Sequence, residues 1–219
     1  MATPTKNQVT RLTRALCEAL DRADYLVRAI ADNGYTDGTN ATNAPGTNLK
    51  KLPVADQRDV AQFVFFEVAA LFEELARSLL YLEVRSLHSL TLNAAQRRVR
   101  TADRQAGRRD GWASPVMMEQ RGTDLTLTKL HANLRNNLGA ANFKALEMAH
   151  RLRNRIAHGK GNQHYADVMN WAGVPPAKKR QGCSPGALLL HYPRGGVRAF
   201  DQFIASYRYY ATVAGSLLP

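Results

Sequence analysis

The sequence predicts an all-α fold, formed by a single domain over residues 1–219. Apolar residues recur at helical spacing along several long stretches, and the chain offers only one short candidate strand. Hydrophobic residues make up 45% of the chain and charged residues 22%, which is typical of a folded globular protein rather than a disordered one. A chain of 219 residues can also bury a sizeable core.

The first two helices are predicted over residues 7–32 and 55–90. The apolar pattern of the first ends at Asn33-Gly34, and residues 35–48, rich in Gly, Thr and Asn, predict a loop. Residues 55–90 are the most hydrophobic segment of the chain. Because its apolar stripe is so wide, this helix is expected at the centre of a bundle or in a dimer interface.

Four glutamates lie on the second predicted helix, and each is expected to face solvent or to pair with an arginine. One of them, with Glu73 as the candidate, could instead support the histidine site described below. The four are Glu67, Glu73, Glu74 and Glu83.

Residues 93–111 are rich in arginine, with few acidic residues to offset the charge. Two interpretations are open, a solvated helix or mobile loop and a surface that contacts an RNA backbone. We favour the second because arginine binds phosphate through two parallel hydrogen bonds and because Trp112 follows the segment. The candidate RNA-binding residues are Arg97, Arg98, Arg100, Arg104, Arg108 and Arg109, together with the later run of Lys178, Lys179 and Arg180.

Residues 124–138 are predicted as a helix capped by Thr123 or Asp124 and closed by Gly139. The next helix follows almost at once, which predicts a tight helical hairpin. The final helix is predicted over residues 197–217.

Residues 160–196 differ from the rest of the chain because Gly and Pro interrupt them repeatedly. We interpret this segment as an excursion before the last helix that could serve as a lid over the site. Residues 164–172 are expected to form a short helix within it. The apolar run 187–192 is expected to be the only strand.

Charge predicts a polyanionic partner. The chain carries 30 Lys and Arg against 18 Asp and Glu, a net charge of +12. Basic surfaces gain free energy when phosphate contacts release counterions, although charge alone leaves DNA, RNA and an acidic membrane surface open.

The sequence predicts a cytoplasmic protein without a membrane partner. No apolar run reaches the length needed to cross a bilayer, and the N-terminus lacks the apolar core of a secretory signal. The two cysteines are too few for a disulfide framework. No spacing of His, Cys and carboxylates predicts a metal site or cofactor.

The segment that carries chemistry is residues 146–159. On a helical wheel, its apolar residues form one stripe, while Glu147, Arg151, Asn154 and His158 lie on the opposite side at spacings of four, three and four. Gly159 is suited to the left-handed residue that closes a helix. His158 is therefore expected in the last turn, where the helix dipole favours its protonated form.

One sequence motif of the chain resembles that of the HEPN superfamily (higher eukaryotes and prokaryotes nucleotide-binding domains). It is Arg153-Asn154-Arg155-Ile156-Ala157-His158-Gly159. The signature of that superfamily is Arg and a polar residue, followed within a few residues by His. The resemblance implies an up-and-down helical bundle, here with a loop-rich excursion before the last helix. It also implies a homodimer in which two motifs face each other.

The resemblance further implies a metal-independent endoribonuclease with no cofactor, acting as a toxin or an antiphage-defence effector. Its catalytic residues would be Arg153, Asn154 and His158. Arg151 also fits the looser spacing to His158 and lies nearer to it on the wheel, so the choice between the two arginines stays open. Arg151, Glu147 and Glu73 are candidate supporting residues.

In the implied reaction, His158 transfers a proton while an RNA 2′-hydroxyl attacks the adjacent phosphate, leaving a 2′,3′-cyclic phosphate. An arginine stabilises the charge that develops on the phosphate oxygens. The alternatives are an inactive HEPN module that binds nucleic acid or a protein, and a basic helical protein whose motif is coincidence. An antitoxin or another defence-system component is a further expected partner.

Overall fold

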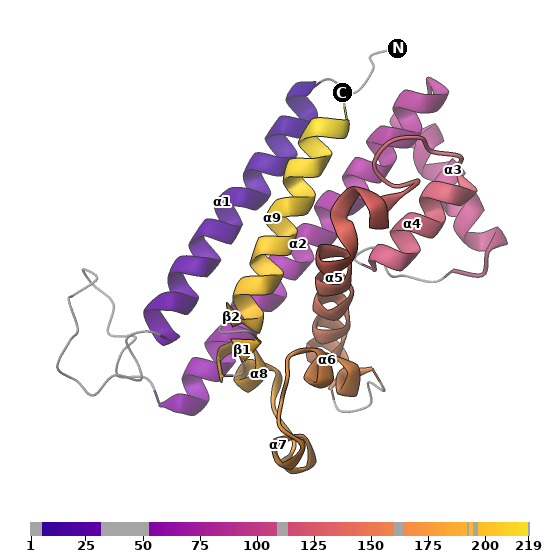
Figure 1. Ribbon diagram of the computed structural model, residues 1–219. Helices are drawn as coiled ribbons and strands as arrows, with labels where there is room; N and C mark the ends of the chain where they lie inside the picture. The colour runs from indigo at the N-terminus through magenta and orange to yellow at the C-terminus, as the bar shows by residue number, and fades with distance from the viewer. Residues whose placement is uncertain are drawn as a thin grey trace. The chain divides into compact units, whose positions relative to one another are not determined.

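The computed structural model describes residues 6–31, 53–108, 114–159, 164–191, 193–194 and 197–218, and these are helical almost throughout (Figure 1). The prediction of an all-α helical bundle is therefore confirmed. The helices within these ranges are α1 (Lys6–Ala31), α2 (Val54–His88), α3 (Leu92–Gln105), α4 (Pro115–Asp124), α5 (Leu134–His158), α6 (Tyr165–Trp171), α7 (Pro176–Gln181), α8 (Pro185–His191) and α9 (Ala199–Leu217). Strands β1 (Pro193–Arg194) and β2 (Val197–Arg198) form one short antiparallel pair.

Helical periodicity located the long helices correctly. The stretches predicted over 7–32, 55–90 and 197–217 correspond to α1, α2 and α9, and the short helix predicted over 164–172 corresponds to α6. The predicted loop over 35–48 lies outside the described residues.

The helix predicted over 124–138 is wrong. Helix α4 ends at Asp124, a segment of turns follows, and α5 begins only at Leu134. The turn segment keeps its backbone out of a helix because the Glu83 carboxylate accepts hydrogen bonds from the backbone N–H groups of Lys129 (3.0 Å) and His131 (3.1 Å). Its leucines are buried all the same, which produced the misleading periodicity.

The strand predicted over 187–192 is also wrong, because the run belongs to α8. A short, continuous apolar run cannot distinguish a buried strand from a buried helix. The start of the helix is visible in the sequence, since Pro185 occupies its first turn and the Ser184 hydroxyl accepts a hydrogen bond from the Ala187 N–H at 3.2 Å.

The chain divides into two compact units. The first comprises Met1–Glu18, Ala69–His150 and Ala205–Pro219, and the second comprises Ala19–Val68 and Arg151–Ile204. Helices α1, α2, α5 and α9 each contribute a segment to both units.

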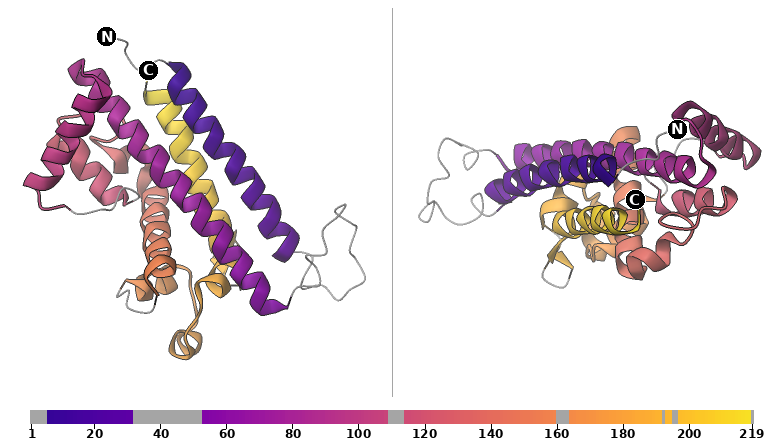
Figure 2. Two further views of the ribbon diagram at one scale, coloured as in Figure 1. Left: turned by 180° about the vertical axis from the view of Figure 1, so that it is seen from behind. Right: turned by 90° about the horizontal axis from the view of Figure 1, so that it is seen from above.

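In the first unit, α3 and α4 lie against the C-terminal end of α2 (Figure 2). Buried aliphatic side chains fill the space around this end; they are Leu80, Val84, Ala95, Val99, Leu125 and Leu127. Asp103 of α3 accepts a hydrogen bond from Arg121 of α4 at 2.9 Å, which joins the two helices, and another from Arg108, just beyond α3, at 2.9 Å. Arg121 is only 1% exposed.

A buried polar cluster links α2, the turn segment and α9 within the first unit. His131 Nδ1 lies 2.6 Å from a Glu83 carboxylate oxygen, and His131 Nε2 lies 3.0 Å from the Tyr210 hydroxyl. Glu83 is only 3% exposed, so the prediction that it faces solvent or pairs with an arginine is wrong. Its partners are a histidine and two backbone N–H groups, which satisfy a buried carboxylate.

Aromatic packing builds the second unit. The Phe203 ring of α9 lies 5.4 Å from Phe65 of α2 and stacks on Trp171 of α6 at 5.0 Å. Helix α8 approaches α2 so closely that a Cβ atom at Gly186 would lie 2.1 Å from the Arg58 carbonyl oxygen. Only glycine fits there.

Candidate functional site

The predicted motif occupies the last turns of α5. Gly139 has φ 72° and ψ 156°, so the helix is broken there, and Asn142 donates a hydrogen bond to the Leu138 carbonyl across the break (3.1 Å). The helix then runs without interruption to His158, and Gly159 has φ 72°. The predicted closing role of Gly159 is confirmed, because its positive φ favours glycine. Gly139 also interrupts the helical conformation, but the helix over 124–138 that it was predicted to close is not formed.

The end of α5 is held by Arg155. Its guanidinium donates a hydrogen bond to the Gly159 carbonyl (2.7 Å) and lies 5.1 Å from the centre of the Tyr165 ring of α6. Figure 1 shows α6 beside the end of α5. A cation at a helix C-terminus stabilises it, so Arg155 performs the capping role that His158 could have taken.

His158 itself is exposed in this last turn. Its imidazole has no hydrogen-bond partner among the residues that the structure describes. An exposed imidazole at a fixed helix end can reach a ligand that approaches from solvent.

The two candidate arginines have different surroundings. Arg153 is half-buried, with its guanidinium 5.5 Å from the centre of the Phe66 ring of α2 and 3.4 Å from the Asn154 side-chain oxygen. Arg151 forms an ion pair with Asp167 of α6. Each guanidinium is therefore oriented by a neighbour from the same unit.

Asp167 also lies near a histidine outside the motif. His164 Nδ1 lies 3.8 Å from the Asp167 carboxylate, and the His164 side chain is 65% exposed. Sequence reasoning did not select Asp167, although it falls in the first turn of a helix that was predicted. The motif residue Arg151 is thus joined through one carboxylate to an exposed histidine of the excursion.

A cavity of about 470 Å³ opens beside the motif helix. Arg155 of α5, Tyr165 of α6 and the loop between α7 and α8 line it. The Tyr165 hydroxyl donates a hydrogen bond to the Cys183 carbonyl at 2.9 Å, which ties that loop to α6. Burial raises the pKa of the Cys183 thiol, so the thiol is protonated at neutral pH.

The remaining supporting residues, Glu73 and Glu147, belong to the first unit, whereas Arg151 to His158 belong to the second. Glu147 forms an ion pair with Lys144, whose Nζ lies 2.9 Å from the Glu147 carboxylate. The supporting role of both glutamates remains a prediction.

The predicted RNA-binding arginines of residues 93–111 fall into three groups. Helix α3 exposes Arg97, Arg98, Arg100 and Arg104, whereas Arg109 lies outside the described residues. Arg108 is only 9% exposed and pairs with Asp103 and Asp124, so we leave it out of any RNA-binding surface.

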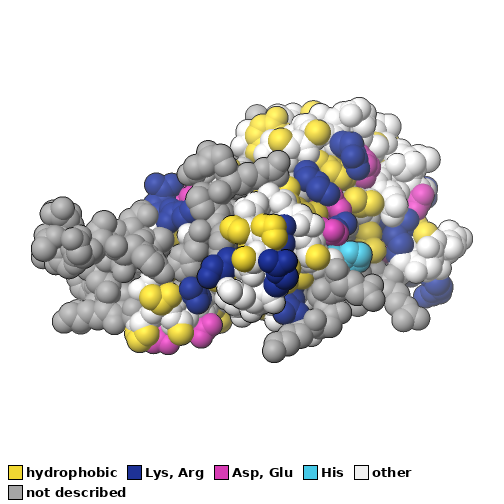
Figure 3. Space-filling model, turned by 60° about the horizontal axis from the view of Figure 1, so that its bottom comes forward, with side chains coloured by type: hydrophobic (Ala, Val, Ile, Leu, Met, Phe, Trp, Pro, Cys, Tyr) yellow, Lys and Arg dark blue, Asp and Glu magenta, His cyan; other side chains and the backbone are white. Residues whose placement is uncertain are grey.

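Helix α7 carries the second basic run. Lys178 and Arg180 are exposed, and Lys179 donates a hydrogen bond to the Asn170 side chain at 2.6 Å. On the face seen in Figure 3, Lys and Arg side chains gather over α7.

Comparisons with protein-family models, with curated proteins and with solved structures give no match. In the described ranges no helix combines the length and the apolar character that crossing a membrane requires. Those ranges also contain no group of three His, Cys, Asp or Glu side chains placed to hold a metal ion.

Proposed function

We propose that this protein is an endoribonuclease of the HEPN type that needs no metal ion and acts as a homodimer. The observation that carries the proposal is the exposed imidazole of His158 at the capped end of α5, about one turn after Asn154 and within about two turns of both Arg151 and Arg153. The sequence motif from Arg153 to His158 in that helix supports the assignment to this superfamily. The net charge of +12 supports a nucleic-acid substrate.

The proposed reaction is transfer of a phosphodiester from the 5′-oxygen of one nucleotide to the 2′-oxygen of its neighbour. His158 accepts the 2′-hydroxyl proton while that oxygen attacks phosphorus. The bond to the 5′-oxygen breaks, and the leaving oxygen takes a proton from an acid, for which the His158 of a second protomer is the candidate. The products are a 2′,3′-cyclic phosphate and a 5′-hydroxyl.

An arginine would stabilise the negative charge that develops on the phosphate oxygens in the transition state. Arg151 shares a face of the helix with His158, and its pairing with Asp167 fixes its direction. Arg153 fits the sequence motif of the family more closely, and its guanidinium lies over the Phe66 ring. Comparing Arg151→Ala with Arg153→Ala assigns the role, because the variant that loses kcat without losing the fold identifies the arginine.

The test is cleavage of a fluorescent single-stranded RNA by the purified full chain in EDTA. We expect wild-type protein to cut and His158→Ala to be slower by roughly a hundredfold to ten-thousandfold. His164→Ala is the matched control, since this histidine is also exposed and lies only six residues away, and it is expected to cut at nearly the wild-type rate. Cyclic phosphate at the new 3′ ends identifies the reaction.

Three results would overturn the proposal: no cleavage by wild-type protein, full activity of His158→Ala, or 3′-hydroxyl products. The biological role that we propose is that of a toxin or antiphage effector. It predicts that expression of the wild-type chain, but not of His158→Ala, arrests cell growth.

A second candidate function is nucleic-acid binding without catalysis. The exposed arginines of α3 favour it because they provide phosphate contacts that do not depend on His158. Under this alternative, RNA binds to wild-type and His158→Ala protein equally and is recovered intact from both.

A further inference from the structure

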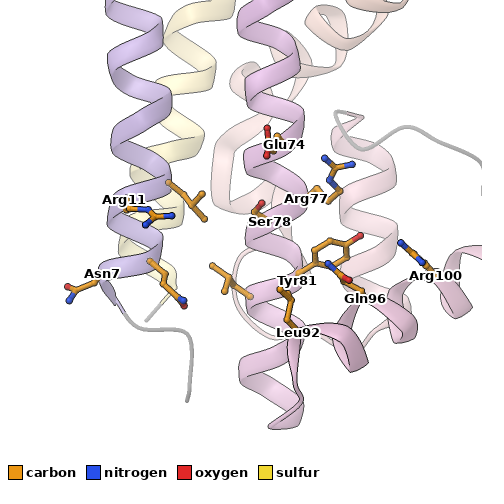
Figure 4. Close-up of a pocket in the computed structure, with 12 residues that line it drawn as sticks. Asn7, Arg11, Glu74, Arg77, Ser78, Tyr81, Leu92, Gln96 and Arg100 are labelled. Atoms are coloured by element: carbon orange, nitrogen blue, oxygen red, sulfur yellow. The ribbon is translucent and has the colours of Figure 1, made fainter. Parts of the chain in front are cut away.

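The first unit contains an open hollow that lies away from the motif residues in the sequence. Its volume is about 600 Å³, and its walls come from the start of α1, the second half of α2 and the part of α3 from Leu92 to Arg100. Figure 4 shows Ser78 of α2 in the middle, with Arg11 of α1 on one side and Arg77, Tyr81 and Arg100 on the other. A volume of this size falls in the usual range for ligand sites, about 300–1,000 Å³.

The charge of the lining is predominantly positive. Arg11, Arg77 and Arg100 line the hollow, against one carboxylate, Glu74. Arg11 and Arg100 are exposed, and in the part of the chain that the structure describes neither has a carboxylate within ion-pair distance. These two guanidinium groups are therefore available to an anion that arrives from solvent.

An aromatic ring lies among these cations. Tyr81 is half-buried, and part of its side chain packs against the aliphatic cluster around Leu80 and Val99. Burial raises the pKa of Tyr81, and the nearby arginines oppose that effect, so the net result is a neutral phenol at pH 7. Gln96 of α3 adds a side-chain amide to the same wall.

Cations that follow an open groove, together with an aromatic ring, are the elements that bind single-stranded nucleic acid. The cations contact the backbone phosphates, and a base stacks on the ring. We infer that this hollow is a groove for single-stranded RNA, with a base against Tyr81 and the backbone along Arg11 and Arg100. The inference rests on the proposed function for the choice of RNA, and it adds a binding site outside the motif.

Two observations favour a strand over a small phosphorylated molecule. Each of the three helices that line the hollow contributes an exposed residue to it, Arg11 from α1, Glu74 from α2 and Arg100 from α3, so the hollow is open to solvent beside all three. The positive surface also continues along α3, where Arg97 and Arg104 lie within about 60° of Arg100 on the helical wheel. Arg98 lies on the opposite side of α3 and is predicted to contribute little.

The test is binding of a fluorescent single-stranded RNA, measured by anisotropy on full chains that also carry His158→Ala to prevent cleavage. The double variant R11A/R100A removes two charges from the groove. The matched control R14A/R98A removes two charges from the same two helices outside it; Arg14 is 78% exposed and does not line the hollow.

We expect R11A/R100A to bind on the order of tenfold more weakly than R14A/R98A. Each lost phosphate contact should also lower the slope of log affinity against log salt by about 0.7, so the slope should fall by about 1.4. An equal loss in both double variants would show that binding depends on diffuse charge and would overturn the groove. So would unchanged binding by R11A/R100A.

Two further variants test the ring and the carboxylate. Tyr81→Leu keeps apolar packing against the core but removes the stacking surface, and it should weaken binding on the order of tenfold. Glu74→Gln removes the one repelling charge and should strengthen binding a few-fold. A duplex of the same length that binds as tightly as the single strand, or an acidic peptide that competes equally with it, would contradict the inference.

The outcome is separable from that of the proposed function because these assays measure binding only. If wild-type protein does not cut RNA but R11A/R100A loses binding, the groove stands and the nuclease proposal fails. If wild-type protein cuts RNA and R11A/R100A binds normally, the nuclease proposal stands and the groove fails.

Discussion

Replacing Glu83 by glutamine tests how the buried polar cluster stabilises the first unit. The Glu83 carboxylate accepts hydrogen bonds from two backbone N–H groups, those of Lys129 and His131, and contacts the His131 ring at 2.6 Å. A glutamine side chain keeps one acceptor oxygen. When that oxygen takes the place of Oε2, which lies against both the N–H and the ring of His131, only the Lys129 N–H loses its acceptor. One unsatisfied buried donor costs about 1–3 kcal/mol, so we expect a loss of roughly 1–3 kcal/mol.

The loss should depend on pH. Burial alone would raise the pKa of Glu83, but hydrogen bonds and charge from His131, with the backbone N–H groups of His131 and Lys129, lower it overall below its ordinary value of 4.5. A carboxylate with a lowered pKa in the folded state adds stability above its unfolded pKa, and that stability disappears as the pH falls through the folded value. The difference between wild type and Glu83→Gln should therefore be full at pH 7 and shrink below about pH 4.5.

Urea unfolding followed by circular dichroism at pH 7 and at pH 4 measures both effects. Glu67→Gln is the control on the same helix, because Glu67 is exposed and its replacement should change stability by less than about 0.5 kcal/mol. The loss in Glu83→Gln should also lower Tm by at least roughly 2 °C. A change below about 1 kcal/mol at pH 7 would refute the reasoning. So would an equal difference at both pH values.

Two further predictions concern the packing of α4, and thermal unfolding checks both. Gly122→Ala would place a Cβ atom 2.3 Å from the backbone of His131, so we expect a loss of about 3 kcal/mol or more, whereas Gly215→Ala, with open space around it, should leave stability unchanged or raise it by up to about 1 kcal/mol. Arg121→Met leaves Asp103 without one of its buried partners and should cost about 3–5 kcal/mol, whereas Arg104→Met on exposed surface should cost less than about 0.5 kcal/mol. Equal Tm values for Gly122→Ala and Gly215→Ala, or for Arg121→Met and Arg104→Met, would contradict the packing described above.

The sequence was sufficient to locate helices that have one clear apolar face. It failed where residues with helical apolar spacing do not form a helix, and where a helix is buried on all sides. Segment 125–133 repeats leucine at helical spacing, yet its backbone bonds to Glu83, a residue more than forty positions earlier in the chain. Helix α8 is buried on all sides at Ala187–Leu190, so it has no periodicity to detect. Distant partners decided both cases, and a local pattern does not contain them.

The candidate site shows the same division. The end of the motif helix at Gly159 followed from local chemistry, because a left-handed residue there favours glycine. The neighbours that orient the arginines, Phe66 and Asp167, come from α2 and α6, and no spacing within the motif points to them. Arg108 illustrates the reverse error, since a charge count cannot tell an arginine paired with Asp103 and Asp124 from an exposed one.

Because the helix is broken at Gly139, the number of residues before the break does not set the direction in which the motif residues after it face. In an uninterrupted helix, one inserted or deleted residue turns everything beyond it by about 100°. Here the residues after Gly139 start a fresh helix, and Asn142 closes the gap by bonding the Leu138 carbonyl. A length change in the preceding turns therefore does not have to rotate the helix face that carries Asn154 and His158.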